Sequence, residues 1–249
     1  MVLLLFSYFI VGLIVGSFLN VCIYRLPLGR SIVSPPSACG TCGHVLGPLD
    51  MIPVLSYIFS GGKCRYCGSA YSMRYAIVEL LTGILFVLCG LQYLPSIALL
   101  LVFAFVASLV VITFIDFDYQ IILDKILIFM LVCGIAYVAV YTKDYSDAFY
   151  GMLVAGSLML IIYFLSRGGM GAGDVKLSFV LGFWLGWKAA LLCLLLAFVM
   201  GGIIGTILLA SGAKSRKDPI PFGPYLCLGA YLSLLYAPYM LFYYWHFFS

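Results

Sequence analysis

Two aspartates lie at the margins of long apolar stretches, where their type and placement could support acid–base chemistry. Asp116 ends an apolar run in VITFIDFD, and Asp174 lies in GMGAGDVK between two apolar stretches. An ionisable side chain at membrane depth is costly, which makes it a candidate functional residue. Two carboxylates brought close together cannot both ionise easily, so one keeps a proton while the other can activate water. The sequence therefore predicts acid–base chemistry by Asp116 and Asp174.

Two further carboxylates, Asp118 and Asp124, lie in the segment IDFDYQIILD. Asp124 opens the next apolar run, where it could serve only as a helix N-cap. A second interpretation makes Asp116 and Asp118 ordinary interfacial carboxylates paired with Lys125 or Arg167. For Asp118 both interpretations stay open from the sequence alone.

Four cysteines form two C-x2-C pairs separated by 21 residues. Cys39 and Cys42 lie in SACGTCGH, and Cys64 and Cys67 lie in GKCRYCGS. Two such pairs can bring four thiolates to one zinc ion, and because no position is left open, the metal would be structural. The alternative is a pair of disulfides. His44 adjoins the first pair and could replace a cysteine, although a role outside the metal shell is the simpler interpretation.

The composition is that of a polytopic membrane protein. Of the 249 residues, 65% are hydrophobic and only 9% are charged, against roughly 25% charged residues in a soluble domain. No basic helix or aromatic-interleaved basic patch supports nucleic-acid binding. A spanning helix needs about 20 apolar residues. We therefore expect an all-α fold with about eight transmembrane helices, with seven as the alternative count, at roughly 2–23, 75–94, 97–115, 122–142, 147–166, 175–187, 189–210 and 222–247.

The distribution of basic residues predicts the orientation of these spans. When the N-terminus is placed outside, all of the 13 Lys and Arg residues except Lys143 and Lys188 fall in inner loops, as the positive-inside rule requires. The inner loops include the basic residues Arg167, Arg216 and Lys217. Asp116 and Asp174 then lie on the cytoplasmic side. The four paired cysteines lie there too, and because cytoplasmic thiols stay reduced, zinc is favoured over disulfides.

Residues 24–74 do not read as a membrane segment, because they are rich in Pro, Gly and Ser and hold the paired cysteines. A segment of about 50 residues is too small to fold on a hydrophobic core alone and needs a staple. We expect three parts: a first transmembrane helix over 1–23, a cytoplasmic zinc-binding loop over 24–74 and a transmembrane core over 75–249.

Six motifs follow one another along nearly the whole chain. They are GSFLNVCIYRLP (Gly16–Pro27), the cysteine loop with IPVLSY (Ile52–Tyr57) between its pairs, MRYAIVELLTG (Met73–Gly83), IDFDYQIILD, GMGAGDVKL and PIPFGPYLCLGA (Pro219–Ala230). In this order they resemble the bacterial type IV prepilin peptidases, bifunctional leader peptidases and N-methyltransferases of the GxGD aspartyl class. GxGD alone would be a weak signal, but six motifs in sequence are highly specific.

The resemblance implies a catalytic pair, Asp116 and Asp174, in an intramembrane-type aspartyl endopeptidase of the bacterial cytoplasmic membrane. The implied substrates are prepilins or pseudopilins, whose basic leader would stay cytoplasmic; pairing of that leader with Asp118 or Asp124 is a further hypothesis. The cysteine loop matches the zinc-binding insert of the family. Leu123 stands where many members have proline, which should alter the turn and not the chemistry.

The resemblance also implies N-methylation of the new N-terminus with S-adenosylmethionine as methyl donor. The chain holds no Gly-rich nucleotide loop, so the sequence does not locate the donor's site. By resemblance alone, the N-terminal signature and the cysteine loop are the favoured region.

Two other classes of function compete with this interpretation. A transporter or channel could use the aspartates as a proton relay, but it would favour internal repeats between halves, which the sequence does not show. A non-catalytic assembly factor of an envelope machine could be built around the zinc loop. Proteoliposome transport assays and a double Asp→Asn variant would separate these alternatives from a peptidase.

Overall fold

The structure is a computed structural model that describes residues 1–93, 95–166, 169–215, 218 and 220–248. Four residues named in the sequence predictions lie outside the described residues: Arg167, Arg216, Lys217 and Pro219.

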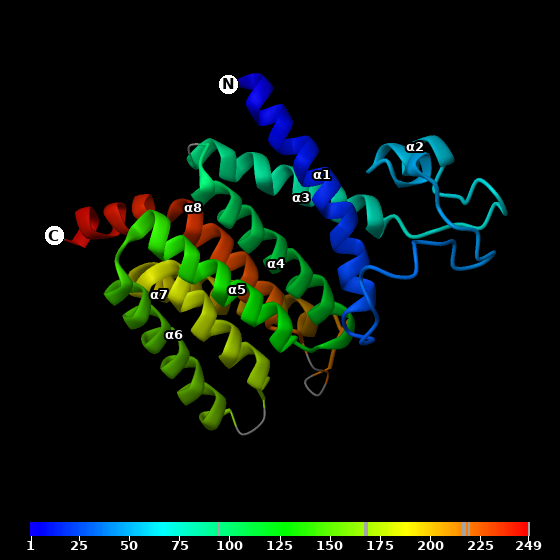
Figure 1. The fold of residues 1–249 in the computed structure, drawn as a ribbon. Helices are drawn as coiled ribbons and strands as arrows, with labels where there is room; N and C mark the ends of the chain where they lie inside the picture. Colours follow the sequence, from blue (N-terminus) through cyan, green and yellow to red (C-terminus); the bar gives the residue numbers. More distant parts are fainter. Residues whose placement is uncertain (94, 167–168, 216–217, 219, 249) are drawn as a thin grey trace. The chain divides into compact units, whose positions relative to one another are not determined.

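The described chain is helical throughout its ordered elements (Figure 1). Its long helices are α1 (Val2–Arg25), α3 (Arg74–Gln92), α4 (Ile97–Tyr119), α5 (Asp124–Tyr137), α6 (Tyr145–Leu165), α7 (Ala172–Ala210) and α8 (Gly223–Phe248). Shorter elements are a 3-10 turn (Pro48–Met51), the helix α2 (Leu55–Ser60) and a π-helical turn (Val138–Thr142) that continues α5. Seven helices of the described chain are long and apolar enough to cross a membrane. The predicted all-α membrane fold is confirmed.

Two predicted spans, 175–187 and 189–210, form the single element α7, which is broken at Gly186. The backbone there has φ 72° and ψ 168°, far from helical values, and glycine adopts such a positive φ without the steric cost of a side chain. The seven long helices therefore contain the eight apolar segments expected from the sequence, with two of them joined at this break.

The second half of α7 runs alongside α8 in the opposite direction (Figure 1). Gly201 lies against Phe222 next to the start of α8, whereas Cys193 lies against Gly229 farther along α8. Because the two helices are antiparallel, the end of α7 lies beside the start of α8.

Replacing Gly186 by alanine should destabilise the protein. The positive φ disfavours any side chain, and a Cβ at this position would overlap the carboxylate of Asp147. A backbone outlier of this kind costs about 1–3 kcal/mol, so Gly186→Ala should lower the midpoint of thermal unfolding in detergent. Gly202→Ala is the matched control in the same helix, because a Cβ there meets nothing within 4 Å. Equal midpoints for the two variants would contradict this account of the break.

The described chain forms two compact units, Met1–Leu99 and Leu100–Ser249. In the first unit, α1 packs closely on α3 through glycines. A Cβ at Gly12 or at Gly16 would lie only 2.7 Å from a backbone atom of α3. Small residues of this kind let membrane helices approach closely and pack.

In the second unit, the indole of Trp184 ties the first half of α7 to α4 and α5. Its ring packs 4.4 Å from that of Phe105 and 5.0 Å from that of Tyr137. Its N–H donates to the carbonyl oxygen of Met130 at 2.8 Å. These contacts fix the helices that carry the two aspartates of interest.

Candidate active site and metal centre

Asp116 lies in the last turn of α4 and is only 5% exposed. Its Oδ2 accepts a 3.0 Å hydrogen bond from the backbone N–H of Gly223, the first residue of α8. A helix N-terminus carries positive partial charge, so α8 presents both a donor and a dipole to this carboxylate. A Cβ at position 223 would lie 2.7 Å from Oδ2, so this approach requires glycine. Among the described residues, Asp116 forms no ion pair with Lys125, one of the partners that the alternative interpretation required.

Asp174 lies in the first turn of α7 and is 7% exposed. Its N–H donates to the carbonyl oxygen of Gly171 at 3.1 Å, and the backbone of Gly171 hydrogen-bonds to its carboxylate. Gly173 lets the turn approach the segment before α5, because a Cβ there would lie 3.0 Å from that of Ile122. Gly171 and Gly173 thus allow a close turn at the start of α7.

The fold brings these two aspartates together. The carboxylates of Asp116 and Asp174 lie close enough to repel each other electrostatically, and the thiol of Cys227 in α8 lies within electrostatic range of both. Each carboxylate stands at the positive end of a helix, α8 for the first and α7 for the second. Burial and like charge disfavour two negative charges here, so the pair is suited to hold one proton between its members, the state that acid–base catalysis needs.

Asp118 and Asp124 are exposed, unlike the buried pair. Asp124 is the first residue of α5 and Leu123 occupies the N-cap position, so the suggested capping role of Asp124 is wrong. Its carboxylate instead pairs with Lys176, whose Nζ lies 2.8 Å from Oδ1 and 3.0 Å from Oδ2. An exposed pair stabilises by only about 0–1 kcal/mol, but this one joins the starts of α5 and α7.

The four paired cysteines converge on one point in the first unit. The Sγ atoms of Cys39, Cys42, Cys64 and Cys67 all lie within 4.8 Å of one another, and the Sγ atoms of Cys39 and Cys67 are 3.9 Å apart. Four sulfurs at the Zn–S distance of about 2.3 Å in a tetrahedron lie about 3.8 Å apart. The cluster could therefore hold one metal ion, and its size and thiolate donors suit zinc.

Both cysteine pairs lie in the same kind of turn. In the first, the N–H of Cys39 donates to the carbonyl oxygen of His44, and the N–H of Gly43 donates to that of Cys39; the second turn repeats both bonds around Cys64. Gly43 and its counterpart Gly68 both have φ 72°. The left-handed glycine closes each turn so that its two thiols point to the same side.

The thiols of the cluster affect one another's ionisation. Backbone hydrogen bonds, chiefly from Cys42, lower the pKa of Cys39 to about 5, and the Ser69 hydroxyl lowers the pKa of Cys67. The backbone of His44 lowers the pKa of Cys42, but burial and the neighbouring thiols outweigh it and raise the pKa to about 11. A bound cation would let all four thiols ionise together, because metal binding deprotonates coordinating thiols.

His44 lies outside the group of four sulfurs. Its ring packs on that of Tyr66, with centroids 3.5 Å apart. The Tyr66 hydroxyl donates to Oδ2 of Asp50 at 3.2 Å, and Arg65 pairs with the same carboxylate at 3.3 Å. The histidine therefore contributes to the packing beside the cluster, as the simpler interpretation of its position held.

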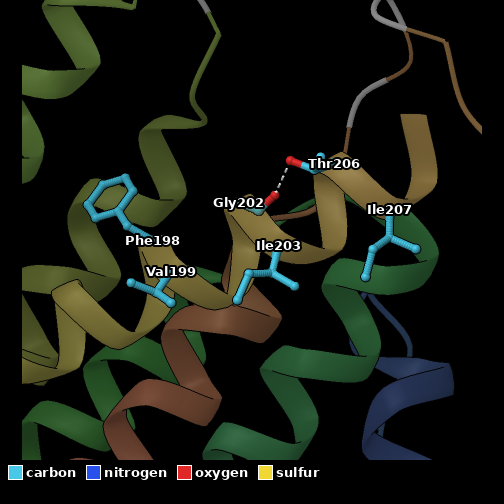
Figure 2. A pocket seen from close by; sticks show the side chains of 6 residues that line it. All are labelled: Phe198, Val199, Gly202, Ile203, Thr206 and Ile207. Atoms are coloured by element: carbon cyan, nitrogen blue, oxygen red, sulfur yellow. Dashed lines mark hydrogen bonds between the residues drawn. The ribbon is translucent and has the colours of Figure 1, made fainter. Parts of the chain in front are cut away.

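A shallow groove of about 490 Å³ lies along the second half of α7 (Figure 2). It is lined by Phe198, Val199, Gly202, Ile203, Thr206 and Ile207. The hydroxyl of Thr206 donates a 2.7 Å hydrogen bond to the carbonyl oxygen of Gly202 in the same helix. No lining residue can titrate, so the groove has no acid–base chemistry and suits the apolar surroundings of a membrane helix.

Two residues that matter for these sites were not singled out from the sequence. Gly223 lies in a recognised motif, but only its contact with Asp116 gives it a role. Glu79 is the one acidic residue of the predicted span 75–94 and is 8% exposed. The rule that flags ionisable residues within apolar runs would have found it.

Comparison with known proteins adds an independent line of information. Residues 10–93 match a family model described as the bacterial peptidase A24 N-terminal domain, and residues 103–206 match that of the type IV leader peptidase family. A Bacillus subtilis relative named prepilin leader peptidase/N-methyltransferase is 35% identical over 92% of this chain and 93% of its own length. Relatives of the same name from Pseudomonas aeruginosa (34% identical, 92% and 89% covered) and Myxococcus xanthus (39%, 85% and 64%) also match. No solved structure gives a significant match.

Proposed function

Since this chain belongs to the type IV leader peptidase family, we propose that it removes the leader peptide from prepilins or pseudopilins and N-methylates the new N-terminal residue. The names of its relatives carry both activities. We propose Asp116 and Asp174 as the catalytic pair. The observation that carries this assignment is the meeting of two buried carboxylates at the N-terminal ends of two helices.

In the proposed mechanism the two aspartates share one proton. The ionised member takes a proton from water as that water attacks the scissile carbonyl carbon. The protonated member gives its proton to the carbonyl oxygen. When the tetrahedral intermediate collapses, the aspartate that took the proton from water gives it to the leaving amine nitrogen, and the other aspartate takes back a proton from a hydroxyl of the intermediate, which restores the shared proton. The N–H of Gly223 and the N-terminal end of α7 stabilise negative charge on the pair. Burial restricts access of bulk water, so these interactions act at low dielectric.

The substrate and the catalytic pair would meet at the cytoplasmic face of the bacterial inner membrane. We propose that the N-terminus lies outside, as the distribution of basic residues predicts. The starts of α7 and α8, and the end of α4, then lie at the cytoplasmic surface. A prepilin places its basic leader on this side and its hydrophobic helix in the bilayer, so the scissile bond would reach the aspartates from the membrane.

We also propose which part of the chain carries each activity. Residues 75–249 would carry cleavage, and the loop 24–74, after the first helix 1–23, would hold zinc through Cys39, Cys42, Cys64 and Cys67. With all four positions taken, the metal is structural. S-adenosylmethionine would supply the methyl group from its sulfonium, and no residue of this chain is assigned to it.

Co-expression with a tagged prepilin tests the function directly. The mature N-terminus would be read by mass spectrometry. We expect a product cut after the leader glycine that carries one added methyl group. A cut product without the methyl mass would remove the second activity. Absence of any cut with several prepilins, together with proton-coupled transport in proteoliposomes, would refute the peptidase and favour the transporter.

Gly223→Ala should slow cleavage while the protein still accumulates in the membrane. A Cβ at this position would lie 2.7 Å from Oδ2 of Asp116, so the carboxylate or the start of α8 must shift. A loss of about 1.4 kcal/mol of transition-state stabilisation lowers the rate tenfold, and we expect at least about this loss. Gly205→Ala is the control, because its Cβ would meet Ile220 at an ordinary 3.8 Å. Wild-type cleavage by Gly223→Ala would show that this contact is not needed.

A further inference from the structure

The cysteine loop contains an apolar surface that the zinc cluster does not explain. Several large apolar side chains between the two cysteine pairs are exposed, and four of them lie in α2 or just before it: Ile52 (40%), Leu55 (49%), Ile58 (63%) and Phe59 (79%). Leu55, Ile58 and Phe59 follow the i, i+3, i+4 spacing of one helical face in α2. A small loop domain in water would bury such a face, so its exposure requires a covering environment.

The start of this segment is tied to the interior of α3. Oε2 of Glu79 accepts a 2.7 Å hydrogen bond from the backbone N–H of Val54, the residue before α2. The hydroxyl of Ser17 in α1 also hydrogen-bonds to Glu79. Val54 has φ 61°, a costly conformation for a β-branched residue, so surrounding contacts must hold it in place.

Glu79, which accepts this hydrogen bond, lies well inside α3 and not at its first residue. It lies in the second turn of α3, about 7.5 Å along the axis from Arg74. Both α1 and α3 are long and apolar enough to span a membrane. In α1, Gly16 packs against Glu79 and lies more than two turns before Arg25, the end of that helix. The N–H of Val54 is therefore held by a side chain whose backbone lies within both of these helices and not at their ends.

The far end of α2 contacts the residues that precede α3. Ser60, its last residue, has its hydroxyl 3.0 Å from that of Tyr71, which precedes α3. The ring of Tyr57 packs edge-on against the ring of Tyr71 at 5.4 Å. Tyr57 and Ser60 of α2 thus contact Tyr71 just before α3, whereas Leu55, Ile58 and Phe59 are exposed. Tyrosine side chains are enriched where a protein meets a membrane interface.

We propose that residues 52–59 form a short re-entrant segment whose exposed face is inserted into the lipid at the membrane surface, with Glu79 as its internal pin. The occupant of this apolar face is lipid, because the segment is hydrogen-bonded to Glu79, which lies within one candidate membrane span and against another. Lys63, exposed just after α2, would lie near the headgroups, where a cation is attracted to anionic lipid. The loop is then held at the membrane by insertion as well as by its two ends.

A photocrosslinker can identify what covers this face. Phe59 would be replaced by p-benzoyl-phenylalanine in the full-length protein in proteoliposomes, and adducts would be identified by mass spectrometry. Leu195, 60% exposed on α7, is the positive control for lipid contact, and Val45 in the first cysteine turn reports the background. We expect the yield of lipid adduct at 59 to be within about twofold of that at 195 and at least about fivefold above that at 45, as for an interfacial helix.

Two results would overturn the proposal. One is an adduct at 59 joined to polypeptide, which would mean that protein covers the face. The other is a lipid yield at 59 no higher than at 45 while position 195 is labelled.

Variants of Glu79 test whether its hydrogen bond to Val54 holds the segment in place. Glu79→Gln keeps a carbonyl oxygen for the N–H of Val54 and should retain the lipid adduct at 59, whereas Glu79→Leu should lower it severalfold. The bound metal content would report that the cysteine turns still fold. An unchanged adduct yield in Glu79→Leu would refute the role of Glu79.

Discussion

Asp174→Asn and Asp116→Asn are each expected to abolish leader cleavage without removing the protein from the membrane. Asparagine is close in size to aspartate but can neither take up nor release the proton. General acid–base groups contribute about 10²–10⁴-fold each, so either variant should lose at least this factor. In Asp116→Asn the side-chain oxygen can still accept the N–H of Gly223, so the fold of the site should survive.

The measurement is the fraction of a tagged prepilin cut at fixed enzyme level, with a matched carboxylate as control. Asp118→Asn changes an exposed aspartate two residues from Asp116 and should lose far less cleavage than either dyad variant, even where the basic leader pairs with this carboxylate. Cleavage at the wild-type rate by either dyad variant would refute the assignment. Methylation of a peptide that is already cut should persist in both variants, which would separate loss of the pair from general misfolding.

Cys64→Ser is expected to release the metal and unfold the loop between the first two long helices. The cluster needs four thiolates for a closed tetrahedral site, and structural zinc contributes roughly 10–16 kcal/mol of apparent binding free energy in small zinc domains. Metal content should fall from about one ion per chain to near zero. The loop should become sensitive to protease, because its 3-10 turn and the short helix α2 give it little core of its own.

Methylation should be lost with the metal, whereas cleavage by the second unit should continue at a reduced or unchanged rate. Cys133→Ser makes the same chemical change in α5, far along the chain from the cluster, and should retain the metal. Wild-type metal content in Cys64→Ser would rule out this cysteine as a ligand. Loss of cleavage equal to the loss of methylation would instead show that the loop is needed for both reactions.

The sequence predicted the membrane helices well because each one depends on a local property. A run of apolar residues of bilayer length forms a helix wherever it lies, and α1, α3, α4 and α6 begin and end within a few residues of the predicted spans. The cysteine cluster was equally accessible, since the C-x2-C spacing lets one tight turn present two thiols. The orientation of the spans and the three-part division of the chain stay predictions.

The errors and omissions arose where residues distant in sequence meet. The break at Gly186 depends on a positive φ and on Asp147 from α6, and no apolar pattern reports either. Asp124 was considered as a cap, but Lys176 of α7 takes its carboxylate. Such contacts depend on how helices pack, which a single sequence does not reveal.

By itself, the sequence determined that this is an all-α membrane protein with four thiols that could hold one metal ion and two candidate aspartates, because hydropathy, spacing and motif order are properties of the chain. Only the tertiary structure decided that the aspartates lie within electrostatic range of each other, and that the start of α8 supplies Asp116 with a backbone donor 107 residues away. It alone also placed Glu79 beneath Val54. The physical reason is that helix packing sets these approaches, through close glycine contacts and buried polar groups that must find partners.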